Sequence, residues 1–127
     1  MREKKILIID DEVSFTNLVK LNLETKGSFT VRTESKGLNA VAAAKEFKPD
    51  MILLDIIMPD MSGGDVAFEL EHDEVTKDIP IVFLTAAVKS EEVNSAEDGM
   101  IGGHTFIAKP TTVDVLLDCI EKTLTGK

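Results

Sequence analysis

Short apolar runs recur along the chain, and each of them ends at a polar residue. The runs span 6–9, 51–54, 81–84 and 106–108, and they are followed by Asp10, Asp55, Thr85 and Lys109. Continuous apolar runs of this length are typical of strands that are buried on both faces. Residues 29–33 alternate weakly between apolar and polar positions and predict a further strand.

Between these runs, apolar residues recur at the spacing of a helix. The predicted buried faces contain Phe15, Leu18, Val19 and Leu23; Leu38, Val41 and Ala42; Val66, Ala67 and Leu70; and Val113, Leu116, Leu117, Ile120 and Leu124. Residues 89–103 are polar and rich in glycine, so they give the weakest helical pattern of the chain. Strands that alternate with helices predict an α/β fold, with a doubly wound, five-stranded parallel sheet and helices on both faces.

The polar residues that end the predicted strands are candidates for a shared site. Ligands of such sheets bind beyond the carboxyl ends of the strands, so the fold gathers Asp10, Asp11, Asp55, Thr85 and Lys109 at one edge. Carboxylates that converge repel one another, and a bound cation relieves this repulsion. With no His or Cys beside these strand ends, the ligands are oxygens, which favours Mg²⁺, Mn²⁺ or Ca²⁺ over Zn²⁺.

A phosphoryl group fits this set of residues. Mg²⁺ typically binds few carboxylates and shares a phosphate oxygen, while the Lys109 ammonium and the Thr85 hydroxyl would hold further phosphoryl oxygens. Asp55 is the natural nucleophile, because carboxylates can form aspartyl phosphates. The alternative is that Asp10 and Asp11 cap the first helix and that Asp55 begins an ordinary turn.

Composition limits the possible locations and partners. The 127 residues suit one domain, which we predict to span 1–127. The formal charge of −9 argues against binding of this domain to nucleic acid. The single cysteine, Cys119, cannot form an internal disulfide, which favours a reducing compartment. No apolar run is long enough for a signal peptide or a membrane span, so we expect a cytoplasmic protein without membrane contact.

The chain resembles the receiver domains of two-component response regulators, of the chemotaxis-regulator type. Four segments carry the resemblance, namely ILIIDD at 6–11, LDIIMPDMSG at 54–63, IPIVFLTA at 79–86 and GGHTFIAKP at 102–110. Together they cover essentially the whole chain in the order of the family. The resemblance implies a flavodoxin-like sheet with the strand order 2-1-3-4-5. The segment between Thr85 and Lys109 is about two residues longer than in the family and contains three glycines, so we expect its helix to be short or shifted.

The resemblance also implies roles for individual residues. Asp10 and Asp11 would hold Mg²⁺ together with Asp55, the phosphoacceptor, and the backbone carbonyl of Ile57. The further implied residues are Thr85 and Lys109 as phosphoryl contacts, Phe106 as an aromatic switch that turns inward with Thr85, and Pro110 after a cis peptide bond. The implied phosphoryl donor is a sensor histidine kinase or a phosphotransfer protein, and the downstream partner is an unknown protein.

Three other functions compete with a phosphorylation switch. An interaction module of the same fold that never turns over phosphate is opposed by the complete set of site residues. A phosphatase of the haloacid dehalogenase type needs an acid at position 57, which is Ile57, so we expect no enzyme beyond self-phosphorylation and self-dephosphorylation. A flavin carrier is opposed by Asp10, Asp11 and the absence of Trp and Tyr. The chain ends just after its last predicted helix, as expected of a stand-alone receiver or of one excised from a longer protein.

Overall fold

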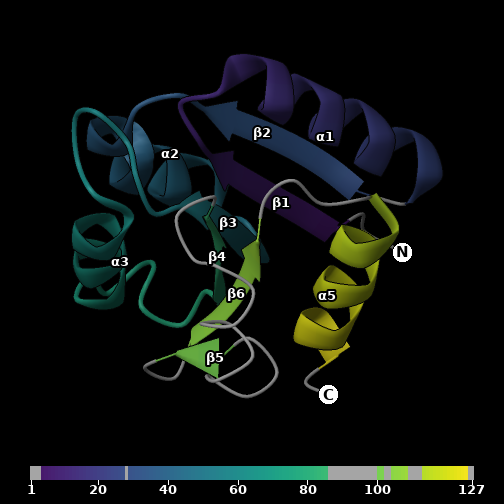
Figure 1. The fold of residues 1–127 in the computed structure, drawn as a ribbon. Helices are drawn as coiled ribbons and strands as arrows, with labels where there is room; N and C mark the ends of the chain where they lie inside the picture. Colours follow the sequence, from purple (N-terminus) through teal and green to yellow (C-terminus); the bar gives the residue numbers. More distant parts are fainter. Residues whose placement is uncertain (1–3, 28, 86–99, 102–103, 109–112, 126–127) are drawn as a thin grey trace.

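A single twisted sheet with helices on both faces forms the centre of the fold (Figure 1). The computed structural model describes residues 4–27, 29–85, 100–101, 104–108 and 113–125. The strands are β1 (Lys4–Ile9), β2 (Phe29–Glu34), β3 (Met51–Asp55), β4 (Ile81–Thr85), β5 (Met100–Ile101) and β6 (His104–Ala108). The helices are α1 (Val13–Lys26), α2 (Ala40–Phe47), α3 (Gly63–Glu71) and α5 (Val113–Thr125), with a 3₁₀ turn η1 (Gly37–Asn39) before α2.

The strand order is β2-β1-β3-β4-β6-β5. All pairs up to β6 are parallel, so these five strands confirm the predicted doubly wound sheet and the implied order 2-1-3-4-5. The two-residue strand β5 adds an antiparallel edge beside β6. It lies in the stretch 89–103, for which the sequence predicted only a weak helix. A strand of two residues is too short to produce a recognisable periodic pattern in the sequence.

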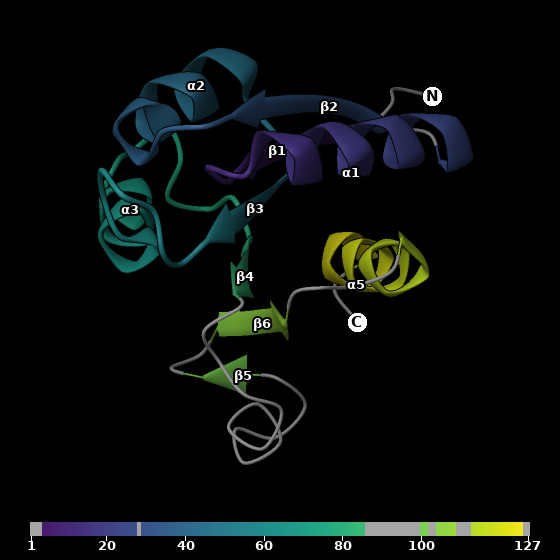
Figure 2. The same cartoon turned by 45° about the horizontal axis from the view of Figure 1, so that its top comes forward.

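Each face of the sheet carries its own hydrophobic core. Ile6, Ile8 and Leu53 point toward α1 and α5, where they pack with residues such as Leu23 and Leu116. The alternate strand residues, such as Leu7, Ile9 and Leu54, pack with α2 and α3 on the other side. Figure 2 shows α2 and α3 on one side of the sheet and α5 on the opposite side. Burial on both faces is the reason why these strands are apolar without interruption.

Two of the predicted helix faces were partly wrong. Leu18 was expected inside but is 58% exposed, because the buried face of α1 contains Thr16, Val19 and Leu23. Thr16 tolerates burial since its hydroxyl donates a hydrogen bond to the Val13 carbonyl at 3.0 Å.

The face predicted from Leu38, Val41 and Ala42 is also displaced. Leu38 is 70% exposed and belongs to η1, while α2 begins only at Ala40 and buries small residues. Ala42 is exposed and Val41 is half-buried. A change from 3₁₀ to α geometry shifts the helical phase, so the spacing counted from Leu38 does not continue into α2.

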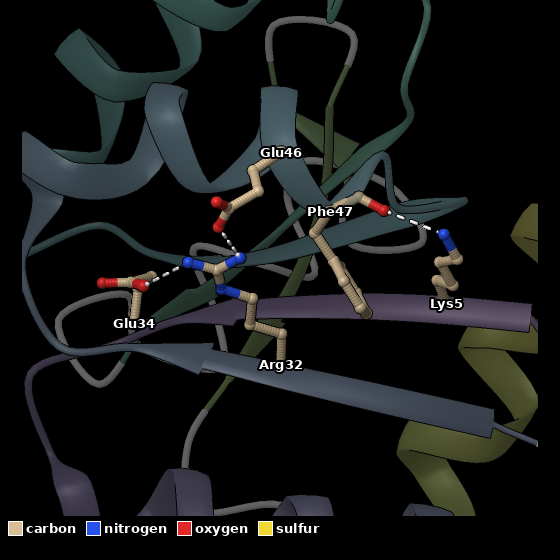
Figure 3. A network of polar contacts seen from close by, with 5 residues as sticks. All are labelled: Lys5, Arg32, Glu34, Glu46 and Phe47. Carbon is tan, nitrogen blue, oxygen red and sulfur yellow. Dashed lines mark hydrogen bonds and ion pairs between the residues drawn. The ribbon is translucent and has the colours of Figure 1, made fainter.

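Side chains tie the edge strand β2 to the layer of α2 (Figure 3). Arg32 pairs with Glu34 at 3.3 Å and reaches Glu46 of α2 at 2.6 Å. On the neighbouring strand, the Lys5 ammonium donates to the Phe47 carbonyl at 3.1 Å and lies 5.3 Å from the centre of its ring. These contacts fix the position of α2 across β1 and β2.

The helix α1 supplies partners for the backbone of the same edge strand. The Val31 amide donates to the Glu24 carboxylate at 3.0 Å, and the Lys20 ammonium donates to the Val31 carbonyl at 2.9 Å. Lys20 and Glu24 also pair with each other at 3.0 Å. Both main-chain groups of Val31 are therefore bonded within the chain, which makes this point of the edge less available for strand addition.

Candidate functional site

The register of the parallel strands brings their carboxyl ends to one edge of the sheet. Ile9 of β1 lies beside Leu54 of β3, and Asp55 lies beside Leu84 of β4. Thr85 in turn lies beside Ala108 of β6. The residues that follow these positions emerge at the same edge, as the sequence predicted for Asp10 and Asp55.

Three carboxylates converge at this edge. Asp10, Asp11 and Asp55 each offer an oxygen, and these oxygens all lie within 4.8 Å of one another. The Asp10 side chain is fully buried, Asp55 is 5% exposed and Asp11 is exposed. Buried like charges at this distance oppose folding unless a cation or protons compensate them.

The donor chemistry and the spacing suit one hard cation. Mg²⁺–oxygen distances are about 2.1 Å, so two ligands on opposite sides of the ion are about 4.2 Å apart. Neighbouring ligands of the same ion are about 3 Å apart, so the three carboxylates would draw closer together on sharing such an ion. The described residues offer only oxygen ligands in this cluster, which fits Mg²⁺ better than a metal that prefers nitrogen or sulfur.

Asp10 also shapes the turn from β1 into α1. Its carboxylate accepts the Glu12 amide at 2.9 Å, and its own amide donates to the Glu34 carbonyl of β2 at 3.0 Å. The N-cap residue of α1 is Glu12, whose side chain makes no capping hydrogen bond. Asp10 and Asp11 therefore do not occupy the cap position that the alternative interpretation gave them, and Asp10 is held with its carboxylate at the sheet edge.

The loop after Asp55 depends on a close approach at Gly63. The Gly63 amide donates to the Ile56 carbonyl at 2.6 Å and closes the loop. A Cβ atom at Gly63 would lie 2.3 Å from the Asp55 carbonyl oxygen and 2.7 Å from the Ile56 Cα. Any side chain at this position would displace the backbone that carries the candidate phosphoacceptor, so Gly63 belongs to the construction of the site.

Sequence reasoning missed Asp60 as a residue of this region. Its carboxylate accepts hydrogen bonds from the amides of Gly37 and Leu38, more than twenty positions earlier in the chain. An Asp that follows Pro59 is typical of a turn, and nothing local reveals such distant partners. The sequence also placed Gly63 in the loop without indicating its contact with Asp55.

The other predicted site residues are described in part. Thr85 ends β4 at the site edge, although its side chain lies outside the described residues, as do Lys109 and Pro110. Phe106 is half-buried and stacks on Phe83, with ring centres 5.1 Å apart and planes inclined by 23°. This contact makes Phe106 part of the core on the α2 side. Its role as a switch stays a prediction, as does the use of the Ile57 carbonyl as a metal ligand.

The fold and the acidic edge define a receiver-type signalling domain. Residues 6–121 match the response regulator receiver domain family, and the chain belongs to this family of two-component signalling. Members of the family interact with histidine kinases or phosphotransfer proteins. Among the described residues, no helix is both long and apolar enough to cross a membrane.

Individual relatives support the same assignment. The chain is 34% identical over 122 residues to the polar-differentiation response regulator DivK of Brucella ovis, covering 95% of this chain and 96% of DivK. It is 40% identical over 107 residues to the phosphate regulon transcriptional regulatory protein PhoB of Pseudomonas aeruginosa, covering 84% of this chain and 45% of PhoB. The chain thus spans about half the length of PhoB.

A solved structure shows the same fold. The chemotaxis protein CheY4 of Vibrio cholerae superposes with a TM-score of 0.79 at 27% identity, covering 94% of this chain and 98% of CheY4. The agreement extends over nearly the whole of both chains.

Proposed function

We propose that residues 1–127 act as one phosphoryl-accepting switch, in which Asp55 receives a phosphoryl group from a sensor histidine kinase or a phosphotransfer protein. The observation that carries the proposal is the convergence of the Asp10, Asp11 and Asp55 carboxylates within 4.8 Å, two of them buried. Charge repulsion of this kind lowers stability, so a site that keeps it is expected to use it. Mg²⁺ is the proposed cofactor, held by the three carboxylates and the Ile57 carbonyl.

In the proposed reaction, an Asp55 oxygen forms a bond to phosphorus while the bond between phosphorus and the donor nitrogen breaks. The donor nitrogen keeps the electron pair, and Asp55 becomes an acyl phosphate. When bound, Mg²⁺ neutralises the carboxylates and the charge on the phosphoryl oxygens. Lys109 and Thr85 hold further phosphoryl oxygens and orient the group for in-line transfer. Apart from transfer to and from Asp55, we propose no enzymatic turnover.

The proposed output follows from the same contacts. Drawing Thr85 toward the phosphoryl group would free space beside β4, and Phe106 of the adjacent strand β6 would turn inward. We also propose a cis peptide bond between Lys109 and Pro110. The altered surface is the proposed docking site of a downstream protein, and no direct binding of this domain to nucleic acid is proposed because of the charge of −9.

Phosphorylation with acetyl phosphate and Mg²⁺, followed by intact mass measurement, tests the proposal. We expect one added phosphoryl group in the native chain, none in Asp55→Asn, and none after chelation of Mg²⁺. Asp65→Asn, on the exposed first turn of α3, is a matched control that should be phosphorylated normally. Absence of any Asp55-dependent product, with beryllofluoride also leaving the NMR spectrum unchanged, would favour the interaction module that never turns over phosphate.

A further inference from the structure

The Asp60 side chain joins two segments that are far apart in the sequence. One carboxylate oxygen accepts the Gly37 amide at 3.2 Å, and the other accepts the Leu38 amide at 3.0 Å. These are the first amides of η1, which lack partners within that turn. The hydrogen bond from Leu38, then that from Gly37 and the nearby charge of Lys36, hold the pKa of the Asp60 carboxyl below its usual value of 3.8. Near neutral pH the Asp60 carboxylate is therefore ionised, and each of its two oxygens accepts one backbone hydrogen bond.

The backbone at Ile57 depends on anchors at either side of it. Before it, Ile56 is held by its amide, which donates to the Leu84 carbonyl at 3.1 Å, and by its carbonyl, which accepts the Gly63 amide at 2.6 Å. The Ile57 side chain is 62% exposed, so packing of this residue does little to orient its carbonyl. The next fixed points along the chain are the buried Met58 and the charged contact of Asp60.

The loop and η1 also pack directly against each other. A Cβ atom placed on Gly37 would lie 3.0 Å from the Met61 Cβ and 3.2 Å from the Met58 Cε. The Met61 Cβ is fixed by its backbone, but the Met58 Cε is the end of a flexible side chain that adapts to many shapes, so apolar packing alone defines the register of the two segments incompletely. The two hydrogen bonds of Asp60 are directional and supply the register that the methionines leave open.

We propose that Asp60 is a positioning residue for the metal site, and that its hydrogen bonds couple that site to η1. This inference rests on the proposed function, in which the Ile57 carbonyl is a metal ligand. Asp60 acts without touching the metal: by fixing the loop on η1 it orients the carbonyl three residues earlier. Because coupling between two sites is reciprocal, metal binding at Asp55 is in turn expected to stabilise the Asp60 contact to Gly37 and Leu38.

A Mg²⁺ titration followed by amide NMR resonances measures both parts of the proposal. Asp60→Ala is expected to bind Mg²⁺ about ten-fold more weakly than the native chain, the range found when supporting contacts of metal ligands are removed. Asp60→Asn retains a single acceptor oxygen and is expected to lie between the two. In the native chain the Gly37 and Leu38 resonances should shift on addition of Mg²⁺, and this response should be lost in Asp60→Ala.

Asp73→Ala is the matched control. Asp73 is a half-buried carboxylate that, like Asp60, has a backbone partner: it accepts the Val75 amide at 2.9 Å and also pairs with Lys45 at 2.9 Å. Val75 and Lys45 both lie outside the loop of residues 56–62, so replacement of Asp73 should leave Mg²⁺ affinity unchanged. If the role of Asp60 were purely structural, Asp60→Ala and Asp60→Asn would lose stability but would keep the native Mg²⁺ affinity.

The outcomes separate this inference from the proposed function. If Asp55→Asn binds Mg²⁺ as tightly as the native chain, the proposed site itself is wrong. If native binding depends on Asp55 while Asp60→Ala and Asp60→Asn keep the native affinity, the proposed function stands and the role of Asp60 is overturned. Asp60→Asn differs from the native side chain by one group, so it serves as the test should Asp60→Ala fail to fold.

Discussion

Replacing Asp55 by Asn should stabilise the chain in the absence of metal. Asp10 and Asp55 are buried, Asp11 is exposed, and their offered oxygens lie within 4.8 Å of each other. Asn has nearly the same shape as Asp and keeps a carbonyl oxygen, so the substitution removes the charge and changes the size of the side chain little. The change therefore measures the net effect of the Asp55 charge on the stability of the folded chain.

The size of the effect follows from Coulomb's law. At 4.8 Å, the upper limit for the distances between these oxygens, two unit charges repel by about 1 kcal/mol in water and by about 3.5 kcal/mol at an effective dielectric constant of 20. The repulsion between Asp55 and the exposed Asp11 lies near the lower energy, and the repulsion between Asp55 and the buried Asp10 is larger than that. After allowance for relaxation, we expect Asp55→Asn to gain about 1–3 kcal/mol, or roughly 3–10 °C in Tm.

Urea unfolding followed by circular dichroism measures this gain. Far-ultraviolet dichroism is suitable because the chain has no Trp and no Tyr for a fluorescence assay. The native chain and Asp55→Asn are compared with a chelator present and then with Mg²⁺. At ten times its Kd, Mg²⁺ should stabilise the native chain by about 1.4 kcal/mol and the variant much less. Glu69→Gln, which removes one charge from the exposed side of α3, is the control.

The reasoning would be refuted by an Asp55→Asn variant no more stable than the native chain in chelator, provided that Glu69→Gln also leaves stability unchanged. Such a result would mean that the carboxylates are already compensated within the folded chain. An equal gain from Mg²⁺ in both proteins would instead place the binding of the ion away from Asp55.

Two further predictions concern the loop and the edge strand. Gly63→Ala should lose about 1–3 kcal/mol through overpacking and should weaken Mg²⁺ binding, because its Cβ would meet the Asp55 carbonyl at 2.3 Å. Gly64→Ala, whose Cβ would meet only the Ser62 hydroxyl at 3.9 Å, should be harmless, and equal unfolding midpoints for the two variants would contradict this account. The hydrogen bond from the Val31 amide, and then that from Lys20, hold the pKa of Glu24 below its usual value of 4.5. The stability that Glu24 contributes is therefore complete above pH 4.5 and is lost as the pH falls through the lower pKa of the folded chain. Glu24→Gln should therefore cost about 0.5–1 kcal/mol near pH 7, with a gap that closes in acid; a gap that does not change with pH in urea unfolding would speak against the ionised contact.

The sequence by itself determined the fold class and the gathering of acidic residues at one edge of the sheet. Apolar runs without alternation are stable only as strands covered on both faces, and strands interleaved with helices form a parallel sheet. The carboxyl ends of such strands share one edge, so the positions of Asp10 and Asp55 at the ends of apolar runs already place them together. The local pattern was sufficient because burial follows from each apolar run and the parallel direction follows from the alternation of strands with helices.

Only the tertiary structure decided how the pieces meet. The buried face of α2 changed because η1 intervenes, leaving Leu38 outside and Ala40 inside. Gly63 is required because the Asp55 carbonyl lies where a Cβ atom would be. Asp60 accepts hydrogen bonds from Leu38 and Gly37, which lie 22 and 23 residues away in the sequence. Contacts of this kind depend on strand register and loop path, which are set by packing of the whole chain. No local period in the sequence records these contacts, because the segments involved are neighbours only in the folded chain.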